Sequence, residues 1–213
     1  MAKTDLNQNA KYVQEFIDSI EPDFVFNNTP LNRFKTTHKS PNTHIKNKTK
    51  ELDRLRNQIN SIENCNIKIN SKNLIMGDGD INSPIMLIGE TPGENEEQVG
   101  HSFQGDIGQL LNKMLMAINI KRDKVYTTYS INFRPPEDRK PTSQEIKRYS
   151  VFVKEHISII NPKILILMGG TAMEAVTGLN RRISNERGQW KEIILKNNTF
   201  PIMITFSPSY LIR

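Results

Sequence analysis

The sequence predicts a three-layer α/β/α fold with a central, mostly parallel sheet of about four strands. Two apolar runs, PIMLIG at 84–89 and KILILM at 163–168, have the profile of strands buried on both faces. Amphipathic helical segments separate these runs from each other and from later strands. Strands that alternate with helices are typical of a parallel sheet covered by helices on both sides.

The N-terminal third differs in composition from the rest of the chain. Residues 9–20 place Val13, Phe16, Ile17 and Ile20 on one helical face, so 1–27 is predicted as an N-terminal helical segment. Residues 28–50 are rich in Asn, Thr, Lys and Pro and predict a mobile, basic linker. A further helix is expected from about 48 to 63, and the α/β domain is expected to span 51–213.

Capping patterns predict where the helices of the domain begin. The capping-box spacing is found at Asp106 with Gln109, at Thr142 with Glu145, and at Thr171 with Glu174. The other expected strands are 125–131, 190–196 and 200–205, the last two joined by a turn at 196–199. In such sheets the ligand site lies beyond the carboxyl ends of the parallel strands. The residues after 89, 131, 168 and 205 are therefore the candidates for chemistry.

Composition narrows the class of protein. The chain has 213 residues, a single cysteine and a net charge of +6. It contains no apolar run of the roughly 20 residues that a membrane helix needs, so a soluble, cytoplasmic monomer is expected. The basic balance favours a polyanionic partner such as DNA. Lys46, Lys48 and Lys50 belong to a basic stretch at 33–56, which is either a solvated surface or an arm that contacts phosphates.

Several short segments, in order and in register, resemble the iron–sulfur, family 4-like branch of the uracil-DNA glycosylases. They are GETPGENE at 89–96, GHSFQG at 100–105, GQLL at 108–111, VY at 125–126, RPP at 134–136, PT at 141–142, PK at 162–163, MG at 168–169 and SPSYLIR at 207–213. The resemblance covers roughly residues 60–213. It implies an enzyme of base-excision repair that extrudes uracil from DNA and hydrolyses its glycosidic bond.

The resemblance assigns roles to residues of the matching segments. Glu90 falls on the family's carboxylate, which positions water or stabilises the sugar cation, although it could instead cap a nearby helix. Phe103 falls on the ring that stacks against uracil, although it could also be an ordinary core residue. Gly89 and Thr91 flank the carboxylate in the predicted substrate pocket. Ser209 and Arg213 belong to the closing motif, which the resemblance places on DNA.

Two working groups of the family are replaced. Tyr129 stands where the family has the asparagine that reads the uracil edge. Nearby Asn132 is expected to point to the opposite face, unless the strand has ended before it. Ser207 stands in the place of the histidine of the closing motif, and serine donates one hydrogen bond but carries no charge. Because losing one preorganised donor costs about 10²–10³ in rate, excision of uracil at full speed is not expected.

The family's cluster ligands are also replaced. The resemblance implies a [4Fe–4S] cluster held by four cysteines, and Cys65 matches the second of them. Ile62, Phe133 and Tyr149 stand at the other three positions. One thiolate cannot hold such a cluster, so no cluster and no other cofactor is expected.

Three functional hypotheses follow from this sequence. The first is a DNA-repair glycosylase with weak activity or altered base choice, which uses Glu90 and Phe103. The second is a catalytically inactive DNA-binding protein of the same fold. The third is a relic that folds but is either no longer under selection or only marginally stable.

Overall fold

The computed structural model describes residues 41–212, with side chains from residue 47 onward. Several predicted features lie outside the described residues. They are the helical segment 1–27, the linker up to residue 40, the side chain of Lys46, and Arg213. Residues 40–213 cluster into one compact unit.

A single six-stranded sheet, in the order β1-β3-β2-β4-β6-β5, forms the centre of the domain. Its four inner strands, β3, β2, β4 and β6, run parallel, whereas β1 and β5 pair antiparallel at the two edges. The strands are β1 Asp78–Gly79, β2 Ile85–Gly89, β3 Tyr126–Tyr129, β4 Ile164–Met168, β5 Trp190–Leu195 and β6 Asn198–Thr205. The predicted fold class is confirmed, but the predicted number of about four strands is too low.

Among the strands of the described residues, β1 was not expected at all, whereas β5 corresponds to the strand expected at 190–196. β1 has two residues, too few for any periodicity to appear in the sequence. β5 and β6 form a hairpin whose turn residues, Lys196 and Asn197, both have positive φ (48° and 66°). Tight two-residue turns of this kind join antiparallel strands, so β5 cannot extend the parallel part of the sheet.

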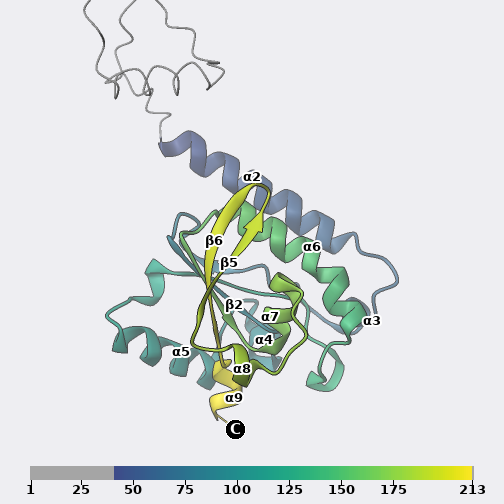
Figure 1. Cartoon of the computed structure of the whole chain (residues 1–213). Helices are drawn as coiled ribbons and strands as arrows, with labels where there is room; N and C mark the ends of the chain where they lie inside the picture. The colour runs from purple at the N-terminus through teal and green to yellow at the C-terminus, as the bar shows by residue number, and fades with distance from the viewer. Residues whose placement is uncertain (1–40, 213) are drawn as a thin grey trace, which may run out of the picture. The chain divides into compact units, whose positions relative to one another are not determined.

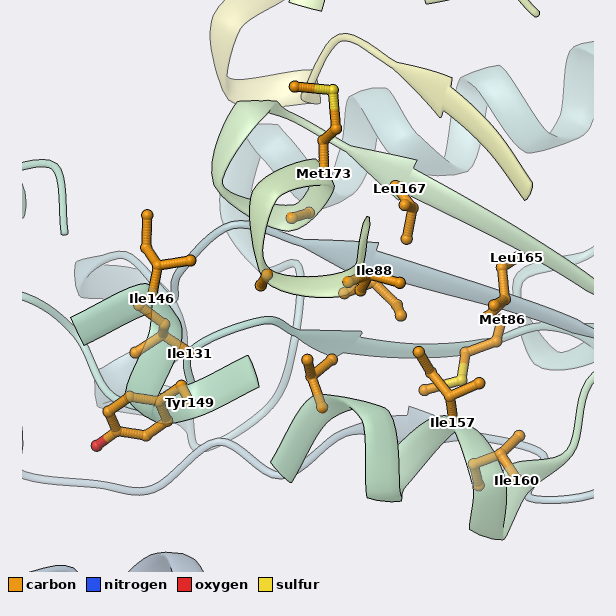
Figure 2. Packing of buried hydrophobic residues seen from close by; sticks show 14 of the residues in the cluster. Met86, Ile88, Ile131, Ile146, Tyr149, Ile157, Ile160, Leu165, Leu167 and Met173 are labelled. Carbon is orange, nitrogen blue, oxygen red and sulfur yellow. The ribbon is translucent and has the colours of Figure 1, made fainter. Parts of the chain in front are cut away.

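Helices cover both faces of the sheet, as Figure 1 shows. One face packs against α6, α7 and α2, and Figure 2 shows Met86 of β2 pointing toward Ile157 and Ile160 of α6. The other face packs against α5 through Leu87 and Met168. The helices are α2 Pro41–Asn60, α3 Asn66–Asn70, α4 Glu94–Val99, α5 Gly105–Ala117, α6 Ser143–Ile160, α7 Gly170–Thr177, α8 Ile183–Glu186 and α9 Pro208–Ile212, with short 3₁₀ turns at Arg122–Lys124 and Pro136–Asp138.

The helix starts test the capping predictions. At α6 the prediction is confirmed, because the Glu145 N–H donates to Thr142 Oγ1 and the Glu145 carboxylate accepts from the Thr142 N–H. At α5 the prediction is wrong, since the helix already begins at Gly105, behind Gln104. At α7 the predicted box is replaced by a carboxylate from a distant loop, described below.

Helix α2 begins at Pro41, seven residues earlier than expected, so residues 41–50 of the predicted linker belong to this helix. Proline suits the first turn of a helix because its missing N–H would have no partner there. Lys48 fixes this part of α2 to the domain, since its Nζ donates to the carbonyls of Ile81 (3.1 Å) and Ile160 (2.8 Å). The composition of the segment gave no sign of this contact.

Candidate active site

The carboxyl ends of β3, β2, β4 and β6 lie along one edge of the sheet. Two of the predicted site residues, Glu90 and Ser207, follow these ends. Glu90 comes directly after β2, Ser130 after β3, Gly169 after β4, and Ser207 follows β6 by two residues. Hydrogen bonds join these loops: the Ser130 Oγ–H donates to the Glu90 carbonyl (2.6 Å) and the Gly169 N–H donates to the Thr205 carbonyl (2.9 Å). The ligand edge predicted from topology is therefore present.

Glu90 caps the start of α7. The backbone N–H of Thr171 donates to Glu90 Oε1 at 3.0 Å. Gly169 (φ +105°) permits this approach, since a Cβ there would lie 2.2 Å from Glu90 Cδ. The helix-capping interpretation of Glu90 is thus confirmed, and it accounts for one of the two carboxylate oxygens. Thr91, next in the chain, is half-buried.

Phe103 and Tyr129 form one buried pair. Their rings stack at a centroid distance of 4.9 Å with an interplanar angle of 27°. The Phe103 backbone N–H also donates to Tyr129 Oη at 2.9 Å. The side chains keep only 6% and 3% of their surface exposed. Burial, and after it the nearby charge of Glu96, raises the pKa of Tyr129 well above its ordinary value, so its hydroxyl is neutral at pH 7.

The last residue of β2, Gly89, packs against the rings of Phe103 and Tyr129. A Cβ at Gly89 would lie 2.8 Å from both Phe103 Cζ and Tyr129 Cδ1, so the rings touch the backbone there. A cleft of about 600 Å³ runs along the loop that carries Phe103, and Asp78, His101 and Arg122 contribute to its lining, but Glu90, Tyr129 and Ser207 do not. Phe103 thus lines the cleft, whereas Tyr129 stacks on Phe103 and does not reach the cleft.

Two carboxylates that the sequence analysis did not single out hold the Phe103 loop. Asp78 accepts from Ser102 Oγ (2.8 Å), from the Ser102 N–H and from His101 Nδ1 (2.6 Å). Burial alone would raise the pKa of Asp78, but these hydrogen bonds lower it below its ordinary value. Glu96, buried at 2% exposure, accepts from the Gln104 N–H (2.9 Å). In the sequence, only the flanking glycines at 77 and 79 could have drawn attention to Asp78 as a residue of the site.

Ser207 is 5% exposed and makes only local contacts. Its Oγ lies 2.6 Å from Ser209 Oγ and accepts from the Tyr210 N–H at 3.2 Å. These contacts cap the short helix α9. Asn132 lies beyond the end of β3, so the argument from strand alternation does not apply to it. Its buried Nδ2 donates to the Ile75 carbonyl (2.9 Å).

The positions that correspond to the cluster cysteines come together in the apolar core. Cys65 Sγ lies 3.4 Å from Tyr149 Oη, and the rings of Phe133 and Tyr149 meet edge to face at 6.4 Å. Ile62 is buried in the same cluster. Burial, with the Cys65 contact second, raises the pKa of Tyr149, so the phenol is not an anionic ligand. With one sulfur among four positions, these residues do not fit a [4Fe–4S] cluster.

The predicted DNA-binding lysines are placed differently from one another. The ammonium of Lys48 is held by two carbonyls, and burial, partly offset by Asp80, lowers its pKa. Lys50 lies exposed on α2. A DNA contact at these lysines, at Ser209 or at Arg213 stays a prediction, and the structure gives Lys48 a role in anchoring α2.

This architecture defines an α/β domain whose parallel strands end along one edge of the sheet, where loops joined by hydrogen bonds carry Glu90 and Ser207. The model of the uracil DNA glycosylase superfamily matches residues 76–213, so the chain belongs to that superfamily. A type-4 uracil-DNA glycosylase of Thermotoga maritima is 35% identical over 150 residues, which cover 70% of this chain and 77% of the relative. Another, of Pyrobaculum aerophilum, is 27% identical over 167 residues, 76% of this chain and 85% of the relative.

A match of a different kind is the DNA polymerase of Bacillus phage SP01. It is 30% identical over 118 residues, which make up 55% of this chain and 13% of the polymerase. Within the part of the chain that the structure describes, no helix has the length and apolarity to cross a membrane.

Proposed function

We propose that this protein is a DNA-binding member of the uracil-DNA glycosylase superfamily, of the base-excision repair type, in which excision of uracil is weak or absent. One observation carries the proposal: the ring of Tyr129 lies against Phe103, where the resemblance puts the extruded base. The Tyr129 hydroxyl also accepts the Phe103 N–H. Tyr129 therefore occupies one face of the Phe103 ring and the backbone N–H of Phe103. A base that enters would have to displace a buried ring.

The chemistry of glycosidic cleavage supports the same conclusion. The departing uracil carries negative charge, and a preorganised donor to such an anion accounts for about 10²–10³ in rate. Ser207 has no charge, and its hydroxyl already faces Ser209 and the Tyr210 N–H. Glu90 remains in place to support positive charge on the sugar, so residual activity, where it occurs, should depend on Glu90.

DNA as the partner rests on the names of the relatives and on the charge of the chain. The type-4 relatives are named uracil-DNA glycosylases, and the chain has a net charge of +6. The match to a phage DNA polymerase supports a domain of this type working beside DNA synthesis. We further propose that the protein is a monomer and that apolar packing around Tyr149 replaces the iron–sulfur cluster.

A gain-of-function experiment tests the proposal. The wild type, Tyr129→Asn, Ser207→His and the double variant are assayed on single- and double-stranded oligonucleotides that contain uracil, hypoxanthine or xanthine. We expect the double variant to cleave uracil at least about 10²-fold faster than the wild type. Adding Glu90→Ala to the double variant should remove the gain. DNA binding by the wild type is measured in parallel at several salt concentrations.

Each outcome has a definite meaning. Uracil excision by the wild type that Tyr129→Asn leaves unchanged would show that Tyr129 does not block the base. Rapid cleavage of hypoxanthine or xanthine by the wild type would favour an enzyme with altered base choice. An absence of salt-sensitive binding would exclude a DNA-binding role.

A further inference from the structure

A column of three side chains stands directly beside Ser207. The guanidinium carbon of Arg187 lies 4.7 Å from the centroid of the Phe206 ring. The ring of Tyr210 also stacks on Phe206, at a centroid distance of 4.9 Å and an interplanar angle of 25°. Two groups cannot occupy the same face of a ring, so Arg187 and Tyr210 cover opposite faces of Phe206.

Backbone contacts hold the column at the ligand edge of the sheet. Phe206 is the first residue after β6, and Tyr210 lies in α9, which the Ser207 hydroxyl caps. Arg187 directly follows α8, and the N–H of the next residue, Gly188, donates to the Ile204 carbonyl at 3.0 Å. Figure 1 shows α8 and α9 together near the end of β6.

Both ends of the column are open to a ligand. Tyr210 is 64% exposed although Phe206 covers one of its faces, so the outer face is free. Among residues 41–212 no hydrogen bond or ion pair engages the Arg187 side chain, so its N–H donors are available. Arg181 and Arg182, which lie before α8 where Arg187 lies after it, add positive charge. Glu186 pairs with Arg181 (3.4 Å) and with Lys191 and offsets this charge in part.

We propose that Arg187, Phe206 and Tyr210 form a binding site for an unpaired nucleotide of single-stranded DNA. The base stacks on the outer face of Tyr210, and Arg187 pairs with a phosphate. Because Arg187 lies two stacking layers from that face, the phosphate belongs to a neighbouring nucleotide rather than to the stacked one. The site rests on the proposed function only in requiring that the chain binds DNA.

The chemistry of the column favours this occupant. Aromatic rings accept any unstacked base because every base has a π face, and cationic groups alongside follow the phosphate backbone. In a duplex, neighbouring base pairs already cover those faces, so an exposed ring gains little there. An arginine stacked on a ring keeps its edge donors free for phosphate oxygens. The site therefore adds affinity for single strands more than for duplex.

The test compares binding of the full chain to a labelled oligothymidine and to a matched duplex, by fluorescence anisotropy over a range of salt. Tyr210→Ala should weaken single-strand binding by about 5- to 100-fold and leave the salt dependence unchanged. Tyr210→Phe, which keeps the ring, should bind within about twofold of the wild type, because stacking needs no hydroxyl. Arg187→Ala should reduce the slope of log affinity against log salt by about 0.7, the value for one phosphate on a single strand.

Lys196→Ala is the matched control, since Lys196 is an exposed cation in the turn at the opposite end of β6. It should change neither the affinity nor the slope measurably. Tyr210→Ala binding like the wild type, or losing as much on duplex as on single strands, would overturn the proposal. If the wild type binds neither the oligothymidine nor the duplex, the nucleotide site and the proposed function are both overturned. Binding that is unaffected by Tyr210→Ala would overturn the nucleotide site alone.

Discussion

Replacing Tyr129 by alanine should destabilise the folded protein and open a cavity next to Phe103. Tyr129 is 3% exposed and stacks on Phe103 at 4.9 Å. Truncation of a buried aromatic side chain to alanine costs about 3–5 kcal/mol in free energy of unfolding. The value should lie toward the upper end of this range, because the stacking (about 0.5–1.5 kcal/mol) and a hydrogen bond are both lost.

Tyr129→Phe separates the two contributions. The phenylalanine ring keeps the stacking, but the buried Phe103 N–H, 2.9 Å from Tyr129 Oη in the wild type, loses its acceptor. An unsatisfied buried donor costs about 1–3 kcal/mol. The expected order of stability is therefore wild type, then Tyr129→Phe, then Tyr129→Ala.

Equilibrium unfolding in urea measures these differences, with Tyr210→Ala as a control. Tyr210 is largely exposed, so its truncation should change stability by about 0.5 kcal/mol or less. Added p-cresol, which matches the deleted side chain, should stabilise Tyr129→Ala by about 1.4 kcal/mol at ten times its dissociation constant and leave the wild type unaffected. A Tyr129→Ala variant within about 1 kcal/mol of the wild type, against the range expected for a buried ring, would refute the idea that Tyr129 fills the base position. Equal stabilisation of both proteins by p-cresol would refute it too.

Three further predictions concern the rest of the domain. Lys48→Met should cost about 1–2 kcal/mol in urea unfolding because two carbonyls lose a charged donor, whereas exposed Lys50→Met should be neutral. Burial lowers the pKa of His156 to about 3 from 6.5, so the unfolded chain takes up this proton first as the pH falls. The stability that His156 confers is complete above about pH 6.5 and should fall by about 2 kcal/mol between pH 7 and 5; His156→Gln should remove that slope, and an unchanged slope would contradict the assignment. The purified protein should contain far less than stoichiometric iron by elemental analysis, and a stoichiometric amount would overturn the assignment of the cluster positions.

The parts of the fold that depend on local pattern were predictable from sequence. The continuous apolar runs of β2 and β4 identified the centre of a parallel sheet, and the ligand edge followed from its topology. The capping box of α6 was also predictable, because Thr142 and Glu145 lie one turn apart and satisfy each other. These features need no information from distant parts of the chain.

Features that depend on distant contacts were missed or, like the capping role of Glu90, were only one of two alternatives. Helix α2 starts early, and Lys48 anchors it through the carbonyl of Ile160, 112 residues away. The cap of α7 comes from Glu90, 81 residues before its partner Thr171. Thr171 and Glu174 have the spacing of a capping box, but the carboxylate of Glu90 accepts the Thr171 N–H instead. Sequence spacing carries no record of such competition.

The resemblance located the candidate site, but it did not predict how the side chains of the site pack against one another. The resemblance identified Phe103 and Tyr129 as neighbours in a pocket, but not that one fills the other's stacking face. Phe103 has a positive φ of 54°, a conformation uncommon for a bulky residue. Hydrogen bonds to Asp78 and Glu96 on either side of it hold the loop. Asp78 belongs to no segment that carried the resemblance, and Glu96 lies in one but received no role from it.

The replacements at the site and at the cluster positions share one physical property, which bears on the relic hypothesis. A site that decays without selection should leave buried polar atoms without partners, each of which costs about 1–3 kcal/mol. Here the Tyr129 hydroxyl accepts the Phe103 N–H, the Ser207 hydroxyl caps α9, and the Tyr149 hydroxyl lies against Cys65. Among the described residues, the only buried side-chain N or O atom without a partner is Oε1 of Gln58, which is not one of the replaced residues. The new residues are therefore integrated into the core, which argues for a stable protein retained for a role other than fast uracil excision.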